Sequence, residues 1–205
     1  MTGATLAGLL TGLSLIVAIG AQNAYVLRQG VRREHIGAVV VVCALSDLVL
    51  IIAGVSGVGA LVEHSGWLLD AVRWFGVVFL LWYALGALRR AWAHDALTAT
   101  GGAPERAARG PVVGRAVALT WLNPHVYLDT VLLLGSIAAV HDDDVSGGRW
   151  WFALGACVAS IVWFSGLGFG ARLLAPLLAR PRAWQVLDVL VAATMIFVAV
   201  RLALG

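Results

Sequence analysis

Two aspartates, Asp47 and Asp129, lie inside stretches that are otherwise apolar enough to cross a membrane. A carboxylate in the hydrocarbon interior costs at least about 2.5–3.5 kcal/mol, so such residues usually mark a functional path. Two of them predict a path for a positively charged substrate. The alternative is a structural role, in which each carboxyl group is protonated or bonded to Ser46, Thr120 or the backbone.

The two aspartates fall at a similar depth in their segments. At about 1.5 Å per helical residue, Asp47 lies about 18 Å along its segment from His35. From Arg115, Asn123 lies about 12 Å and Asp129 about 21 Å into the later segment. Against a hydrocarbon core of about 30 Å, both carboxylates are predicted near the midplane.

Polar and helix-breaking residues accompany the aspartates at two points. Pro124, beside Asn123, removes a backbone donor in mid-segment and frees carbonyl groups of the preceding turn. Gly20 makes a second flexible point and is followed by Gln22 and Asn23. Paired interruptions of this kind indicate a transporter site. Alternatively, Gln22 and Asn23 serve only as hydrogen bonds between helices.

The elements that must position these residues are membrane helices. The chain has 205 residues, of which 61% are hydrophobic and only 12% charged, with a mean hydropathy of +0.92. Apolar runs of roughly 20 residues predict six spans and leave no room for a soluble domain. The predicted fold class is all-α and polytopic, with spans at about 4–28, 36–62, 67–89, 113–139, 150–172 and 184–204.

All 14 basic side chains are arginines, and their positions predict the orientation of the chain. Short cytoplasmic loops collect basic residues, and eleven of the 14 fall in the first, third and fifth loops. These loops are predicted to be cytoplasmic, with both termini outside. The net charge of +3 is therefore explained by arginines in cytoplasmic loops, and no nucleic-acid partner is predicted.

A polar stretch from about His94 to Pro111 divides the six spans three and three. Because three is odd, the second half must cross the membrane in the opposite sense, as in inverted-repeat transporters. The chain is predicted as one transporter domain, 1–205, with halves at about 1–92 and 113–205 and a cytoplasmic loop at about 93–112. Two short similarities support a repeat. Gly20–Asn23, followed by Tyr25, resembles Asn123–His125, followed by Tyr127. Cys43 stands three residues before Ser46, as Cys157 stands three before Ser160.

Other features indicate packing rather than chemistry. Gly8/Gly12 and Gly166/Gly170 have the four-residue spacing of close helix contacts. The five histidines are scattered without metal-ligand spacing, and the sequence has no P-loop. Neither a metal nor another cofactor is therefore predicted.

Three further ionisable residues in the predicted spans are left out of the predicted site. Asp70 and Arg73 are three residues apart near a span end and are predicted to pair on one helix face. Asp188 lies near the start of the sixth span and is also excluded.

Three blocks of sequence carry a family signature: GAQNAYVLRQG at Gly20–Gly30, CALSDLVL at Cys43–Leu50 and TWLNPHVYLDT at Thr120–Thr130. They resemble the basic amino-acid exporter (LysE) family, and the resemblance covers essentially the whole chain. The NPHVYLD stretch is typical of the lysine/arginine branch. One departure is Ala21, where the family usually has proline.

The resemblance implies export of L-arginine and L-lysine through a bacterial cytoplasmic membrane. One of the two aspartates would pair with the cationic side chain, while the other carries a proton. Amide groups and the opened backbone would bind the amino and carboxylate groups. The predicted substrate-binding set is Gln22, Asn23, Asp47, Asn123, Tyr127 and Asp129, with Asp47 and Asp129 as proton-coupling candidates and Gly20 and Pro124 as helix breaks.

Several alternatives stay open at this point. Export of small neutral amino acids, such as homoserine or threonine, would leave the aspartates to protons alone. An intramembrane enzyme would need a nucleophile and a base, but Ser46 and Ser160 have no histidine at a matching depth. A passive cation channel is a further alternative, and a homo-oligomer is left open.

Overall fold

The computed structural model describes residues 1–17, 20–57, 66–97, 108–123, 126–144, 147–174 and 181–204. Every regular element in these ranges is a helix, which confirms the predicted all-α class. The four longest helices are α3 (Ile36–Val55), α5 (Gly66–Leu97), α9 (Gly148–Gly170) and α11 (Pro181–Leu204). Each contains a stretch long and apolar enough to cross a membrane, as expected of a multi-pass membrane protein.

The first and fourth predicted spans are not single helices. α1 (Thr2–Ile16) and α2 (Ala21–Arg32) meet at an angle of 83°. Within the fourth, α6 (Arg109–Trp121) ends early, and the π-helix η1 (Tyr127–Leu133) then runs directly into α8 (Leu134–Asp144). The described residues thus contain four candidate spans, or five if the bent pair is one span. The arrangement of six spans as a 3+3 inverted repeat stays a prediction.

α5 continues through Leu97 and α6 begins at Arg109, so helix covers both ends of the predicted cytoplasmic loop at about 93–112. The division of the chain at this loop stays a prediction. The end of an apolar run marks where a helix leaves the membrane, and the helix itself continues through residues of good helix propensity. α3 ends at Val55, short of the predicted 62, because Gly57 adopts a left-handed φ of 92° that stops a helix.

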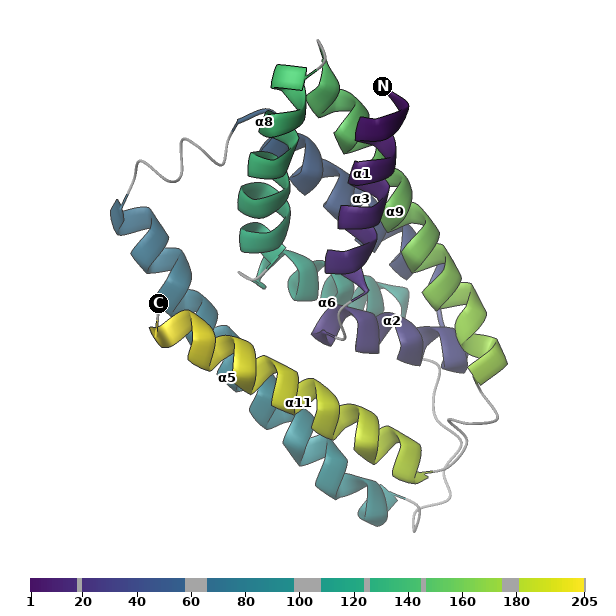
Figure 1. The fold of residues 1–205 in the computed structure, drawn as a ribbon. Coiled ribbons are helices and arrows are strands. Elements are labelled where there is room, and N and C mark those ends of the chain that lie inside the picture. Colours follow the sequence, from purple (N-terminus) through teal and green to yellow (C-terminus); the bar gives the residue numbers. More distant parts are fainter. Residues whose placement is uncertain are drawn as a thin grey trace.

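The helices form two groups, shown in Figure 1. α1 lies along α9, which also packs against α3, and α3 in turn contacts η1 and α8. The second group is α5 with α11, which lie side by side and antiparallel (Figure 1). α2 and α6 run across the ends of the first group, between it and the α5–α11 pair (Figure 1).

Buried apolar side chains connect these helices. One cluster joins α2, α5 and α11 and includes Val26, Leu80 and Val191. A second joins α3 and α9 and includes Ile51 and Phe152. The broken helices are therefore anchored on both sides by long, continuous ones.

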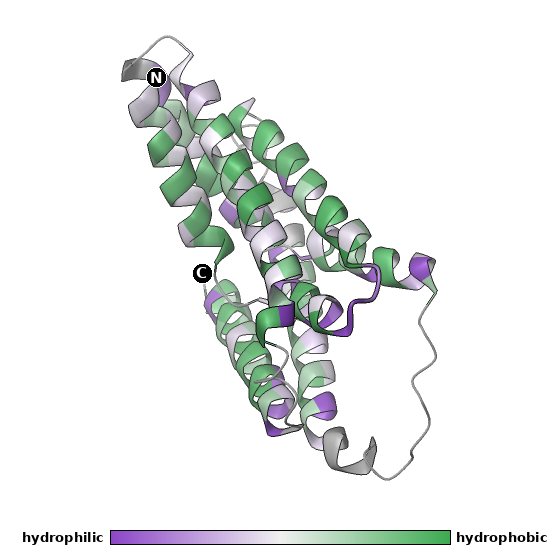
Figure 2. Cartoon of the chain, turned by 90° about the vertical axis from the view of Figure 1, so that its right-hand side faces the viewer, coloured by the Kyte–Doolittle hydropathy of each residue, from purple (hydrophilic) through white to green (hydrophobic). Residues whose placement is uncertain are grey.

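The outward faces of the long helices are strongly apolar. Val78, Trp82 and Phe197 are 66%, 68% and 65% exposed, and Figure 2 shows hydrophobic residues along most of each long helix. Soluble proteins rarely expose apolar surface on this scale. Lipid tails cover such faces, so the bilayer is a partner of this surface.

Glycines allow α1 and α9 to approach closely. A Cβ atom on Gly155 would overlap the backbone of α1, and one on Gly8 would overlap the backbone of α9. Small residues permit this kind of contact between membrane helices. The predicted contacts of Gly166 and Gly170 are wrong, because no described atom lies within 4 Å of a Cβ at either position. At this end of α9 the glycine in contact is Gly168, which meets α3.

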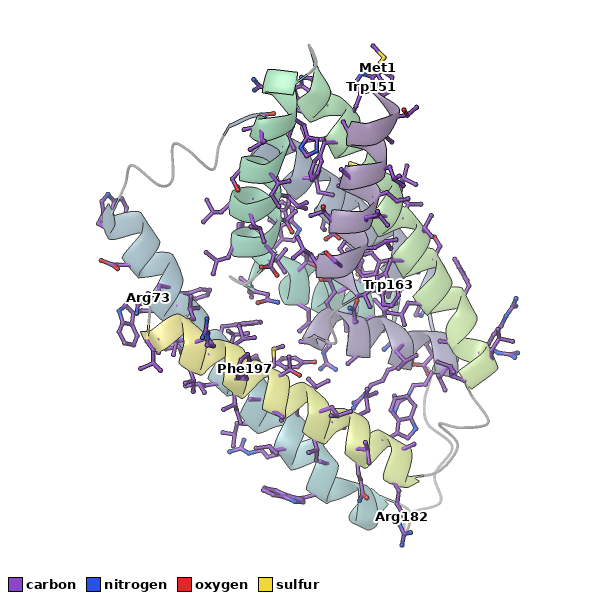
Figure 3. The ribbon with its side chains drawn as sticks, in the orientation of Figure 1. Met1, Arg73, Trp151, Trp163, Arg182 and Phe197 are labelled. Atoms are coloured by element: carbon purple, nitrogen blue, oxygen red, sulfur yellow. The ribbon has the colours of Figure 1, made fainter. Side chains whose placement is uncertain are left out.

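Arg73 does not pair with Asp70, contrary to the prediction. Its Nε donates to the carbonyl oxygen of Leu202 at 2.6 Å, and its Nη2 donates to that of Ala203 at 2.8 Å. Figure 3 places Arg73 beside the C-terminal end of α11. The last carbonyl groups of a helix lack partners within it and carry partial negative charge. They therefore hold the guanidinium without a carboxylate.

An ion pair spans the turn between α8 and α9. Nε of Arg149 donates to Oδ2 of Asp142 at 2.8 Å. This side-chain hydrogen bond holds the pKa of Asp142 below its usual range. Because the folded-state pKa is depressed, the contribution to stability is present at neutral pH and is lost as the pH falls through that pKa.

We expect Gly155→Ala to destabilise the protein, because the added methyl group forces α1 and α9 apart. Overpacking of this kind costs about 1–3 kcal/mol and should lower the apparent Tm of the purified protein in detergent. The control is Gly166→Ala on the same helix, where an added Cβ meets no described atom within 4 Å. Equal Tm values for the two variants would contradict the close packing of α1 on α9.

Candidate functional site

A cavity of about 100 Å³ lies between the two broken segments. Its walls come from both ends of the α1–α2 break, from α3, from η1 and from α11. Five of the six predicted substrate-binding residues line it: Gln22, Asn23, Asp47, Asn123 and Asp129. Residues separated by up to about a hundred positions in the chain therefore meet at one point.

The first break delivers the start of α2 to this cavity. Gly20 is the N-cap of α2, and Gly20, Ala21 and Gln22 all line the cavity. Gly20 has no side chain to cap the helix, and the first N–H groups of a helix have no partner within it. The cavity therefore faces a helix N-terminus, which favours a negatively charged group.

The second break lies between Trp121, the last residue of α6, and Tyr127, the first residue of η1. The predicted helix breaker Pro124 lies outside the described residues. The Tyr127 hydroxyl donates to the carbonyl oxygen of Trp121 at 2.8 Å. Tyr127 therefore bridges the break, and it does not line the cavity with the other predicted residues.

The π-helix η1 holds Asp129 in its first turn. A π-helix has a wider turn than an α-helix and is often found at functional sites. A Cβ on Gly54 of α3 would lie 2.7 Å from the carbonyl oxygens of both Thr130 and Val131. Glycine at position 54 thus lets the backbones of α3 and η1 touch, which brings Asp129 to the same cavity as Asp47.

Asp47 is 5% exposed and is held from α9. The hydroxyl of Ser160 donates to its Oδ2 at 3.0 Å. Ser46, the preceding residue, accepts a hydrogen bond from the indole Nε1 of Trp121 at 3.0 Å. Two adjacent residues of α3 therefore connect that helix to α9 on one side and to the end of α6 on the other.

Asn23 holds the first break closed. Its Nδ2 donates to the carbonyl oxygen of Ile16 at 2.6 Å, and its Oδ1 accepts from the indole Nε1 of Trp163 at 3.2 Å. Figure 3 shows Trp163 on α9 near the junction of α1 and α2. Gln22 is different, because its buried Nε2 has no oxygen or nitrogen partner among the described residues and interacts only with the thiol of Cys43, a weak acceptor. Gln22 can therefore still donate a hydrogen bond to a ligand.

The cavity is electrostatically suited to a molecule that carries both signs of charge. Two carboxylates, Asp47 and Asp129, favour a cation, and the N-terminus of α2 favours an anion. In the described parts of the chain, no group of three or more histidine, cysteine or acidic residues is placed to hold a metal ion.

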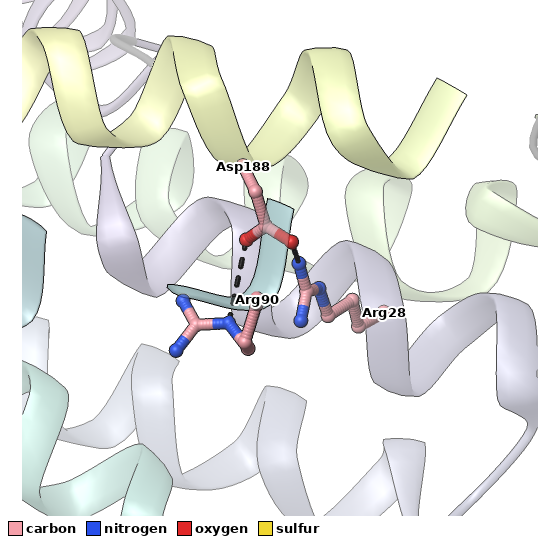
Figure 4. A network of polar contacts seen from close by, with 3 residues as sticks. All are labelled: Arg28, Arg90 and Asp188. Carbon is pink, nitrogen blue, oxygen red and sulfur yellow. Dashed lines mark hydrogen bonds and ion pairs between the residues drawn. The ribbon is translucent and has the colours of Figure 1, made fainter. Parts of the chain in front are cut away.

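One carboxylate that was left out of the predicted site connects three helices. Asp188 of α11 is 1% exposed. It forms an ion pair with Nη2 of Arg28 on α2, and its Oδ1 accepts from Nε of Arg90 on α5 at 3.4 Å (Figure 4). One carboxylate therefore ties three helices together. The rule that selected Asp47 and Asp129, a carboxylate in an apolar span, applies to Asp188 as well.

Comparison with known proteins places these features in a family. The model of the LysE type translocator family matches residues 13–205. Arginine exporter protein ArgO of Enterobacter sp. (strain 638) is 44% identical over 196 residues, which are 96% of this chain and 91% of the relative. Arginine exporter protein ArgO of Escherichia coli (strain K12) is 43% identical over 196 residues, which are also 96% of this chain and 91% of the relative.

A third relative is Rv0488 of Mycobacterium tuberculosis (strain ATCC 25618 / H37Rv). It is 48% identical over 188 residues, which are 92% of this chain and 90% of the relative. No solved structure matches the chain. The family model and the relatives each cover most of the sequence, and the chain therefore belongs to the LysE family of translocators.

Proposed function

We propose that this protein exports L-arginine, and L-lysine with it, from the cytoplasm of a bacterium through the cavity between the two helix breaks. The observation that carries the proposal is the meeting of Asp47 and Asp129 in one cavity that also faces the start of α2. A basic amino acid needs this combination, because it carries one or two cationic groups and a carboxylate. The ArgO relatives, named as arginine exporters, support the choice of arginine.

Each charged group of the substrate has a counterpart in the cavity. Asp129, which is only half-buried, pairs with the guanidinium or ammonium group of the substrate side chain. The α-carboxylate binds at the N-terminus of α2 and accepts a hydrogen bond from Nε2 of Gln22, whose described neighbour is the weakly accepting thiol of Cys43. Asn123 is 6% exposed, lines the same cavity and receives the α-amino group through its amide oxygen.

Asp47 serves as the proton carrier in this scheme. A buried carboxylate beside a neutral hydroxyl is costly to keep charged, so Asp47 suits a role in which it gains and loses a proton. Export of a cation from a cell with a negative interior works against about 2.3 kcal/mol per charge per 100 mV. A proton returning through Asp47 would offset that work.

The conformation described here is a contracted one. Ligand pockets usually measure about 300–1,000 Å³, whereas this cavity measures about 100 Å³. Its α11 wall is formed by Thr194, Met195 and Val198. Since α11 packs mainly along α5, we place the opening movement in the α5–α11 pair, which would carry this wall away from the two breaks.

The proposed setting is the bacterial cytoplasmic membrane, with loops one, three and five inside, both termini outside and residues 1–205 acting as one transporter domain. A transporter fits this chain better than an enzyme, because the relatives are named as exporters.

We expect Asp47→Asn to separate transport from the proton gradient. In proteoliposomes loaded with labelled L-arginine, wild type should release arginine faster when a pH gradient is imposed. Asp47→Asn should still exchange arginine across the membrane but ignore the gradient, because an amide carries no exchangeable charge. Asp129→Asn should lose arginine exchange itself.

The matched control is Asp70→Asn, which removes an exposed carboxylate that lines neither of the two described cavities. It should behave like wild type. If Asp47→Asn and Asp129→Asn also behave like wild type, both carboxylates are structural and the proposed mechanism is wrong.

A second prediction concerns the charge of the substrate. Citrulline has the shape of arginine without its positive charge, so it can donate a hydrogen bond to Asp129 but cannot form an ion pair with it. We expect the loss of the charged partner to cost about 1.5–3 kcal/mol, or about 10- to 150-fold in affinity. In counterflow assays, citrulline should therefore compete with labelled arginine about 10- to 150-fold less well than unlabelled arginine does, and lysine should compete well.

Equal competition by homoserine or threonine would instead favour an exporter of neutral amino acids. The absence of saturable counterflow would favour a channel.

A further inference from the structure

A second and larger cavity, of about 710 Å³, lies between α2, α5, α6 and α11. We call it the arginine cavity, because five arginines line it: Arg28, Arg32, Arg89, Arg90 and Arg115. Among the described lining residues, Asp188 is the one acidic side chain. A cavity with this excess of positive charge attracts an anion.

Asp188 does not neutralise the whole set. Its carboxylate is occupied by Arg28 and Arg90 (Figure 4). Those two guanidinium groups are also held in place by aromatic rings, with Arg28 at 5.3 Å from the ring centre of Trp184 and Arg90 at 5.5 Å from that of Tyr83. Both residues line the cavity, but their charge is already paired with Asp188.

The other three arginines have no acidic partner among the described residues. In the described part of the chain, no ion pair involves Arg32, Arg89 or Arg115. They come from three helices, α2, α5 and α6, and all three line the same cavity. Several guanidinium groups around one cavity can bind the several oxygens of a phosphate group.

A buried amide adds a second polar feature. Gln29 is 7% exposed and lines the arginine cavity. Its Oε1 is buried without a hydrogen-bonding partner among the described residues. An unused acceptor beside a phosphate site fits a ligand that carries a hydroxyl group as well as a phosphate.

The rim of the cavity is apolar and faces outward. Trp82 and Leu85 of α5 line the cavity and are 68% and 47% exposed, and Leu122 beyond the end of α6 is 46% exposed. A free anion in water gains nothing from such a rim, whereas the acyl chains of a lipid would cover it. Basic pockets between membrane helices on the cytoplasmic side are typical headgroup sites, and the arginines here adjoin the loops predicted to be cytoplasmic.

We propose that the arginine cavity binds the headgroup of an anionic phospholipid, with Arg32, Arg89 and Arg115 on the phosphate and Gln29 on a headgroup hydroxyl. The lipid adds negative charge to a cavity that would otherwise repel a cationic amino acid. This site is separate from the transport cavity, and its occupancy does not depend on the identity of the exported substrate.

Native mass spectrometry of the purified full chain tests the proposal. The detergent-solubilised protein is mixed with equimolar phosphatidylglycerol and phosphatidylcholine, and retained lipid is counted. Wild type should retain phosphatidylglycerol at least ten-fold over phosphatidylcholine. The double variant Arg89→Gln/Arg115→Gln should lose that preference. The control Arg172→Gln/Arg182→Gln removes two exposed arginines outside the cavity and should keep it.

A rim variant keeps the test informative if the double variant fails to fold. Trp82→Ala changes a side chain that is 68% exposed, so it should fold and retain several-fold less phosphatidylglycerol. An unchanged lipid preference in Arg89→Gln/Arg115→Gln, or its loss in the control pair, would overturn the site. If inorganic phosphate stabilised wild type as strongly as phosphatidylglycerol does, the ligand would be a soluble anion and the lipid proposal would be wrong. Arginine transport enters none of these readouts.

Discussion

Inside a bilayer, a backbone group that leaves the helical hydrogen-bond pattern must be bound by the protein itself. The two helix breaks of this chain depend on that constraint. At the first break, the side-chain amide of Asn23 donates a hydrogen bond to the carbonyl oxygen of Ile16. At the second, the hydroxyl of Tyr127 donates to the carbonyl oxygen of Trp121. Polar side chains are thus needed at the breaks to bind the freed backbone groups, whether or not a substrate is present. The cavity between the breaks is where the remaining polar groups can face one another.

The walls of that cavity differ in how firmly they are held. α3 is fixed to α9 through Ser160 and Asp47 and to the end of α6 through Trp121 and Ser46. The α11 wall belongs to a helix that packs mainly along α5. Asp188 is the polar tie between that pair and α2. A firmly held wall opposite a separately held helix pair would suit the proposed transport by alternating access.

The sequence predicted the composition of the site better than its geometry. Carboxylates and amides in apolar spans are costly, so Asp47, Gln22 and their neighbours could be selected from residue type alone. The π-helix around Asp129 could not be predicted, because it depends on contact with α3 at Gly54 and not on local propensity. Nor could the partners of Asp188 and Arg73, which come from helices far away in the sequence. The hydropathy of a segment indicates which residues lie in the membrane, but it does not indicate which helices pack against each other.

The wide turn at η1 has a consequence for how this family can change over time. A π-helix contains one residue more per turn than an α-helix would use over the same length. Deleting a residue there would restore regular winding, and would rotate the preceding residues by about 100° relative to α8 without breaking the helix. Asp129 would then turn away from α3 while α8 kept its own packing. A single codon lost or gained at this turn is therefore a small genetic step that would remove or install a charge in the cavity between the two breaks.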